Sequence, residues 1–235
     1  MILEAGSGGS TLDWRRVQAR IAATTRTCAY DRAGYGLSDP ARRPSDARDA
    51  ADDLHRLVRA GGLGPPPVLV GHSNGGLYVV ACAERFPRAV SGLVLVDPGY
   101  PGQPGYAAYG LGVRRAADLH AWAQGLVAEA AHCAARARAG SLHADTPGEP
   151  CLATQPDLDP RVRAALLRIY ATRGETGATV SELRSSVATT DGVTLDDREV
   201  SARTGQLGSL PMVVLTAQSH PAPVPGFSPD EQARY

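Results

Sequence analysis

The sequence feature that most limits the possible folds of this chain is a Gly-x-Ser-x-Gly segment at residues 71–75. The apolar run Val68–Val70 before it predicts a short buried strand, and the small and apolar residues after it predict a helix that ends near Phe86. A strand that turns this sharply into a helix holds Ser73 in a strained backbone conformation with its hydroxyl pointing outward. We expect glycine on either side of Ser73 because a Cβ there would collide with the neighbouring strand or helix.

The place of Ser73 in this turn also indicates a chemical role. It lies at the N-terminus of the expected helix, where unpaired N–H groups and the helix dipole favour a developing negative charge. A strand before the serine and a helix after it are the context that a nucleophile motif requires, so we interpret Ser73 as a nucleophile. The alternative is a Gly/Ser-rich turn that merely exposes a serine, because the five-residue pattern alone is loose.

Length and charge narrow the class of protein. The chain has 235 residues, 43% of them hydrophobic, which is enough for one sizeable domain with an inserted subdomain. Basic and acidic residues each number 24, so the net charge is zero and indicates no nucleic-acid partner and no acidic membrane surface. No apolar run approaches the ~20 residues of a membrane-spanning helix, so no membrane span is expected.

The N-terminus and the cysteines bear on compartment and on metal binding. Residues 1–4 have neither the basic region nor the apolar core of a signal peptide, which favours a cytoplasmic location. The four cysteines form no C-x-x-C pair, so we expect no metal site. Cys28 and Cys82 are expected to act as small buried hydrophobes, whereas Cys133 and Cys151 lie in a more polar region and would pair in an exported protein.

Strands and helices alternate along most of the chain. Expected strands are Met1–Ala5, Thr27–Tyr30, Val68–Val70, Gly92–Val96 and Pro211–Ala217, and helices are expected at 12–23, at 46–60 and after Ser73. This alternation predicts right-handed crossovers and an α/β fold with a mostly parallel sheet flanked by helices. Trp14, Val17 and Ile21 should face the core from the first helix, and Ser45 should cap the second.

A long helical segment separates the fourth and fifth strands. Helices are expected at 113–138, from Pro160 onward, at 176–190 and at 196–203. We expect residues 1–98 to form the first part of the core, 99–209 a helical cap, and 210–235 the continuation of the core. A helical excursion between parallel strands favours a lid over the carboxyl edge of the sheet, where ligands bind in open α/β sheets. A helical layer without a gating role is the alternative.

Four segments of this chain resemble the α/β-hydrolase family, in the family's order and at its usual separations. They are Leu3–Ser10, Asp31–Ser38, Gly71–Gly76 and Leu93–Asp97. The resemblance covers residues 1 to about 100, is weak over the cap, and extends to 210–217 by position only. It implies that Ser73 is the nucleophile and that the backbone N–H groups of Ser7 and Asn74 form an oxyanion hole. A serine hydroxyl is a weak nucleophile, so attack on a carbonyl requires such a hole and a base.

The acid and the base of the triad stay open at this stage. Some members of the family place the acid where Asp97 stands, although Asp97 can equally cap the turn that follows. The family's catalytic histidine follows a final strand, whereas no histidine follows His220 here. Either His220 is the base or no residue is, and His72 is expected to line the pocket or pack. The resemblance therefore implies a hydrolase cut at both ends, with an incomplete sheet.

These observations predict a hydrolase that cleaves a carboxylic ester or related acyl compound of small size through an acyl-enzyme, without metal or organic cofactor. A peptidase, an amidase and a carbon–carbon bond hydrolase are alternatives on the same scaffold, and so is a weak or inert copy that lacks the catalytic histidine. Serine at position 73 argues against haloalkane or epoxide cleavage, for which the family uses a carboxylate there. The edges of an incomplete sheet also predict self-association.

Overall fold

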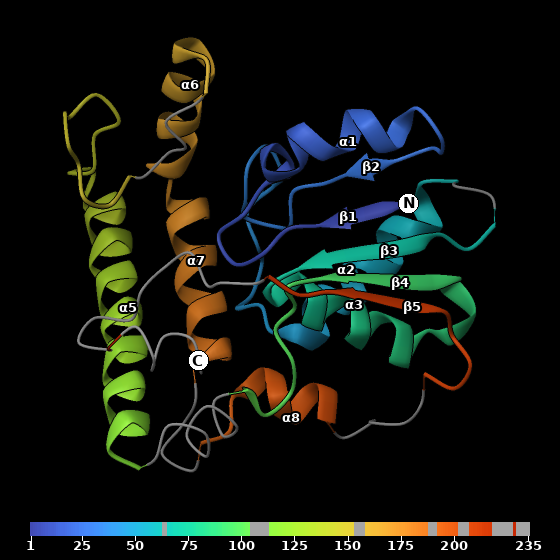
Figure 1. Cartoon of the computed structure of the whole chain (residues 1–235). Helices are drawn as coiled ribbons and strands as arrows, with labels where there is room; N and C mark the ends of the chain where they lie inside the picture. Colours follow the sequence, from blue (N-terminus) through green and yellow to red (C-terminus); the bar gives the residue numbers. More distant parts are fainter. Residues whose placement is uncertain are drawn as a thin grey trace.

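A computed structural model describes residues 1–62, 65–103, 113–152, 158–187, 192–201, 207–217 and 228. Its centre is a five-stranded sheet with helices on both faces (Figure 1). The strands are β1 (Ile2–Glu4), β2 (Cys28–Ala29), β3 (Val68–His72), β4 (Gly92–Val96) and β5 (Met212–Leu215). Their order is β2-β1-β3-β4-β5 and every pair is parallel, which confirms the expected α/β fold.

The register of the strands brings three chain segments to one edge of the sheet. Glu4 of β1 lies opposite Gly71 of β3, and His72 of β3 lies opposite Val96 of β4. Because parallel strands end at the same edge, the residues that follow β1, β3 and β4 meet there. Those residues include the three segments that the sequence analysis connected with catalysis.

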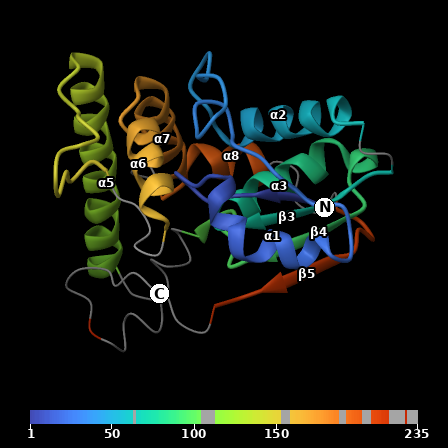
Figure 2. The ribbon, with the colours of Figure 1, turned by 90° about the horizontal axis from the view of Figure 1, so that it is seen from above.

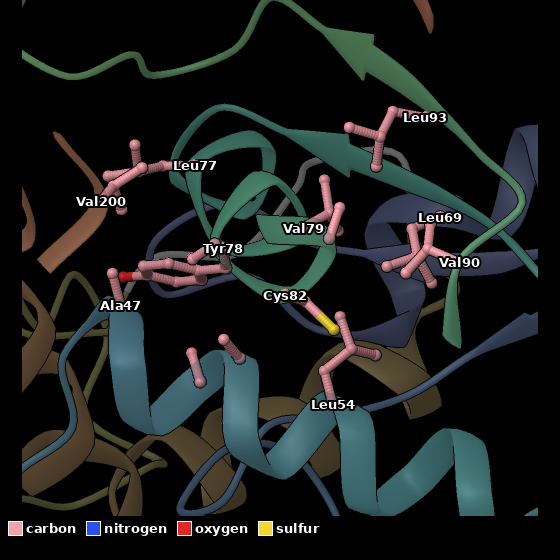
Figure 3. Close-up of a cluster of buried hydrophobic side chains, with 14 of the residues drawn as sticks. Ala47, Leu54, Leu69, Leu77, Tyr78, Val79, Cys82, Val90, Leu93 and Val200 are labelled. Carbon is pink, nitrogen blue, oxygen red and sulfur yellow. The ribbon is translucent and has the colours of Figure 1, made fainter. Parts of the chain in front are cut away.

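The larger part of the core lies on one face of the sheet. There α2 (Ala47–Ala60), α3 (Asn74–Arg85) and α8 (Leu195–Ser201) pack together (Figure 2). Side chains from these helices and from the strands form one apolar cluster, in which Leu54, Tyr78 and Leu93 are fully buried (Figure 3). Each fully buried aliphatic side chain of this kind contributes about 1.5–3 kcal/mol.

The opposite face carries a thinner layer. A 3₁₀ helix, η1 (Thr11–Trp14), runs into α1 (Arg15–Ala22), and Trp14 packs with Leu3, Ala5 and Val70. Val17 was expected in this core, but its side chain is 42% exposed. The physical reason is that α1 has no second described helix beside it on this face, so only part of its apolar stripe is covered (Figure 2).

The expected cap of α2 is also wrong by one residue. Asp46 caps α2, because its carboxylate accepts a hydrogen bond of 2.9 Å from the N–H of Asp49. The N–H of Ser45 instead donates to Ser181 Oγ at 2.6 Å. The N–H of Ala47, to which a Ser45 cap could bind, donates to Asp196 Oδ1 at 2.8 Å, and this contact with a residue 149 positions away favours Asp46 as the cap.

Between β4 and β5 the chain forms long helices that lie beyond the carboxyl ends of the strands (Figures 1 and 2). These helices are α5 (Val113–Ala139), α6 (Pro160–Tyr170) and α7 (Arg173–Ser186). A disulfide joins Cys133 of α5 to Cys151, whereas Cys28 and Cys82 are free thiols. Burial raises the pKa of the Cys82 thiol to about 12, which fits its expected role as a small core residue. None of the described helices has the length and apolar character that crossing a membrane requires.

Candidate active site

The turn between β3 and α3 holds Ser73 in an unusual backbone conformation. Its φ is +51° and its ψ is −129°, values that residues with a side chain rarely adopt. The N–H of Ser73 donates to the carbonyl of Val96 at 3.2 Å, and the carbonyl of Ser73 accepts from the N–H groups of Gly76 and Gly99, both at 2.8 Å. Hydrogen bonds on both sides thus maintain a strain that costs about 1–3 kcal/mol.

The glycines beside Ser73 are required by close backbone contacts. A Cβ on Gly71 would lie 2.4 Å from the carbonyl oxygen of Gly75, and a Cβ on Gly75 would lie 2.4 Å from that of Ala5. Both distances are far below any real carbon–oxygen contact. The reason expected from the sequence for these two glycines is therefore confirmed.

The loop after β1 passes directly beside Ser73. A Cβ built on Gly6 would lie 3.1 Å from Ser73 Cβ, and the side-chain amide of Asn74 donates to Ser7 Oγ at 2.8 Å. The backbone N–H groups of Ser7 and Asn74 donate no hydrogen bond to any other described residue. The two segments expected to supply an oxyanion hole are therefore neighbours, while their role as donors stays a prediction.

A buried arginine, which was not predicted from the sequence, supports this loop. Arg32 is only 7% exposed. Its Nη1 donates to the carbonyl of Ala5 at 2.7 Å and to Glu4 Oε1 at 2.6 Å, and its Nη2 donates to the carbonyl of Gly6 at 2.8 Å. The available sequence signal was a charged residue at the carboxyl end of each of two short expected strands, because Glu4 ends β1 and Arg32 follows shortly after β2.

Two buried carboxylates, those of Glu4 and Glu182, face the single guanidinium group of this cluster. Glu182 of α7 accepts from Arg32 Nε at 2.6 Å, and the hydroxyl of Tyr30 donates to Glu4. Burial raises the pKa of Glu4, although Arg32 opposes the shift. Burial alone would lower the pKa of Arg32, but the carboxylates of Glu182 and Glu4 raise it well above its usual value. The guanidinium therefore stays charged in the interior.

Asp97 lies at the same edge of the sheet, directly after β4. Its φ is +45°, its N–H donates to the carbonyl of Leu215 at 2.6 Å, and its Oδ1 accepts from the N–H of Ala217 at 3.3 Å. The last contact fits the structural interpretation of Asp97, and its place one strand from Ser73 fits the catalytic one. Its role as the acid stays a prediction.

The base is not identified by the described residues. His220 lies outside them, and the hydroxyl of Ser73 forms no hydrogen bond within the described part of the chain. His72 is exposed beside the loop after β1, with its Nδ1 3.2 Å from a Cβ built on Gly6. His55 is remote from this edge and stacks on Phe86 with ring centroids 3.7 Å apart.

A cavity of about 320 Å³ lies between this loop and the helices α5 to α7. Its lining includes Gly8, the disulfide of Cys133 and Cys151, Tyr170 and Glu175. Burial raises the pKa of Glu175 to about 7, while a hydrogen bond of 2.8 Å from the N–H of Gly36 partly opposes this shift. Across the residues that the structure describes, no three His, Cys, Asp or Glu side chains are grouped so that they could hold a metal ion.

Comparison with known proteins agrees with this architecture. A family model described as alpha/beta hydrolase fold matches residues 1–165. The 2-(acetamidomethylene)succinate hydrolase of Mesorhizobium japonicum is 32% identical over 97 residues, which are 41% of this chain and 34% of that protein. An AB hydrolase superfamily protein of Gibberella zeae is 35% identical over 100 residues, which are 41% of this chain and 31% of that protein. The matches thus span about a third of the length of these two curated relatives.

Solved structures resemble nearly the whole chain. A haloalkane dehalogenase variant from Bradyrhizobium elkanii superposes with a TM-score of 0.67 at 19% identity, over 91% of this chain and 71% of that one. A deformylase variant from Pseudomonas putida S16 superposes with a TM-score of 0.51 at 21% identity, over 99% of this chain and 77% of that one. At such identities the likeness shows the fold alone.

Proposed function

This chain belongs to the alpha/beta hydrolase fold family, and on that basis we propose that it cleaves a carboxylic ester or related acyl compound with Ser73 as nucleophile. The observation that carries the proposal is the backbone of Ser73, which is held at φ +51° where a central strand meets a helix. This conformation presents the hydroxyl at the carboxyl edge of the sheet, beside the loop after β1. Nothing in the packing of a simple turn requires such a strained serine.

In the proposed reaction, Ser73 Oγ attacks the acyl carbon while a base takes its proton. The negative charge that develops on the acyl oxygen is stabilised by the N–H groups of Ser7 and Asn74. The bond to the leaving alcohol then breaks, the alcohol takes the proton, and the acyl group stays on Ser73 as an ester. Water hydrolyses this ester by the same sequence and restores the serine. His220 is the residue that we propose as base, with Asp97 as its acid.

A second candidate is cleavage of an acyl carbon–nitrogen bond, as in an amidase. The names of two similar proteins favour it. One is named as a hydrolase of 2-(acetamidomethylene)succinate, a compound with an acetamido group, and the other is named as a deformylase. The chemistry differs only in the leaving group, which is an amine instead of an alcohol. Turnover of an ester and an anilide of the same short acid would separate the two candidates.

We also propose that 1–98 and 210–235 form the core and that 99–209 form a cap over a small acyl substrate. The position of α5 and α7 beyond the carboxyl ends of the strands supports this division. The cavity beside Gly8 supports it too, because it opens between the loop after β1 and these helices.

A fluorophosphonate probe tests the proposed nucleophile. We expect one label per folded chain in the wild type and none in Ser73→Ala. Ser91→Ala is the matched control, because Ser91 is an exposed serine at the opposite end of β4 and should leave labelling unchanged. A folded wild type without label would favour the inert copy, and a labelled Ser73→Ala would assign the nucleophile elsewhere. Loss of nitrophenyl ester turnover in His220→Ala would identify the base, and unchanged turnover would exclude it.

A further inference from the structure

Arg32 binds the loop after β1 through two consecutive carbonyl groups. Its Nη1 donates to the oxygen of Ala5 and its Nη2 to the oxygen of Gly6. Only a planar guanidinium group presents two donors in a fixed fork of this kind. Since the side chain is nearly fully buried, water does not compete strongly for these two oxygens.

The contact with Gly6 fixes the direction of another group. The carbonyl of Gly6 and the N–H of Ser7 belong to one planar peptide unit, and in a trans peptide they point in opposite directions. The described residues contain no cis peptide bond. The oxygen of Gly6 accepts from Arg32 Nη2 at 2.8 Å and from the N–H of Gly9 at 3.0 Å. Two donors on this oxygen therefore also set where the N–H of Ser7 points.

The same cluster connects the loop to α7. One carboxylate, that of Glu182, accepts from Arg32 Nε at 2.6 Å and from the N–H of Gly8 at 3.1 Å. Glu182 is only 2% exposed and lies 150 residues after Arg32 in the sequence. The conformation of the loop thus depends on a side chain that reaches it only when α7 is packed in place.

We propose that Arg32 is a positioning residue that, together with Glu182 of α7, aims the N–H of Ser7 at the oxygen of the reacting acyl group. The inference rests on the proposed function, because it concerns the oxyanion hole of that reaction. It adds that the oxyanion hole is complete only while α7 is packed against the loop after β1. A purely structural role for the buried ion cluster is the competing explanation.

Arg32→Lys is the variant of choice, because it keeps the charge between Glu4 and Glu182 but loses the fork that holds two carbonyl groups. We expect kcat for a short-chain nitrophenyl ester to fall by about tenfold to a hundredfold, somewhat less than the loss of a whole oxyanion-hole donor. KM should change by less than about threefold, because the donor acts mainly on the transition state. A trifluoromethyl ketone, which forms a similar oxyanion, should lose affinity in parallel with kcat.

Arg85→Lys is the matched control. Arg85 also binds a carboxylate through two nitrogens, Asp52 at 2.8 and 3.1 Å, but it joins α3 to α2 and touches no part of the loop. Its kcat should equal that of the wild type. Glu182→Gln, which is isosteric and keeps one acceptor, decides the question if Arg32→Lys does not fold, and it should also lower kcat with little change in KM.

The outcomes separate this inference from the proposed function. A wild type whose Ser73 takes no fluorophosphonate would overturn both. A labelled wild type, with unchanged kcat in folded Arg32→Lys or folded Glu182→Gln, would overturn only the role of Arg32. If kcat fell equally in Arg32→Lys and in Arg85→Lys, the effect would be structural, and the positioning role of Arg32 would also be overturned.

Discussion

At the scale of single residues, the turn at Ser73 combines a conformational cost with the role of nucleophile that we propose for this residue. Ser73 and Asp97 are the non-glycine residues with positive φ in the described part of the chain, and each follows the end of a central strand. A backbone conformation that costs about 1–3 kcal/mol persists only where the surrounding contacts hold it in place. Here the three hydrogen bonds of the Ser73 peptide groups do so.

Replacing Ser73 by glycine should therefore give a more stable fold than replacing it by alanine, and both changes should abolish the ester cleavage that we propose. Glycine adopts φ +51° without a Cβ penalty, so we expect the free energy of unfolding to exceed that of Ser73→Ala by about 1 kcal/mol. The estimate lies at the low end because glycine also gains entropy in the unfolded chain. Denaturant unfolding of the two variants measures the difference, and fluorophosphonate should label neither. Equal stability of the two would mean that the turn is unstrained.

At the scale of elements, α7 holds the loops of the core in place. Glu175 accepts from the N–H of Gly36, Ser181 both accepts from and donates to the backbone of Ser45, and Glu182 contacts Arg32 and Gly8. Glu175 and Glu182 are seven residues apart and so lie on one side of the helix, and Ser181 directly precedes Glu182. The contact of α7 with the core is therefore polar and buried, and its strength depends on protonation.

Glu175 makes this contact sensitive to pH. Its folded pKa is raised from 4.5 to about 7 by burial first, with Asp31 and Glu182 adding to the rise, and Gly36 and Arg32 opposing it. A raised folded pKa gives stability that is present below pH 4.5 and lost as pH rises through about 7. Glu175→Gln keeps an acceptor for the N–H of Gly36. Because its amide does not ionise, this variant does not lose stability at position 175 as pH rises. Between about pH 5 and about pH 8, the unfolding free energy of Glu175→Gln minus that of the wild type should rise by on the order of 1–3 kcal/mol.

Thermal or denaturant unfolding at several pH values measures this gain. Asp196, whose pKa burial also raises to about 7, contributes equally in both chains and cancels from the comparison. Glu129→Gln is the matched control, because it removes an exposed carboxylate from the lining of the same cavity. A difference between Glu175→Gln and wild type that does not vary with pH would contradict the burial of a charged group at this contact.

How far the sequence predicts this structure depends on the range of each interaction. The segment β3–Ser73–α3 and the bounds of β4 and α5 were predictable, because strand patterns, glycines and helix stops are local signals. Arg32 was not, because its partners Glu4 and Glu182 lie 28 and 150 residues away. The choice of Asp46 over Ser45 as cap and the exposure of Val17 likewise depend on what packs nearby in three dimensions.

At the scale of the whole molecule, the sheet has an apolar edge. Within the part of the chain that the structure describes, β5 is the last strand in the order and pairs with β4 alone, and its side chains Met212 to Leu215 are 40–53% exposed. In contrast, Leu69 and Leu93 of the inner strands are fully buried. An edge strand with unpaired backbone groups and exposed apolar side chains is a template for pairing with another chain.

We therefore expect the chain to self-associate through β5. The mean sedimentation coefficient should rise with concentration over the micromolar range, and Val214→Lys should lower this rise, because charged side chains oppose edge pairing. Val17→Lys is the matched control, since Val17 is a similarly exposed valine, at 42%, but lies on a helix and offers no free backbone. A wild type that sediments as one monomer at every concentration would contradict the expectation. An equal effect of the two lysine variants would attribute association to net charge instead of to the strand, because each adds one positive charge to a neutral chain.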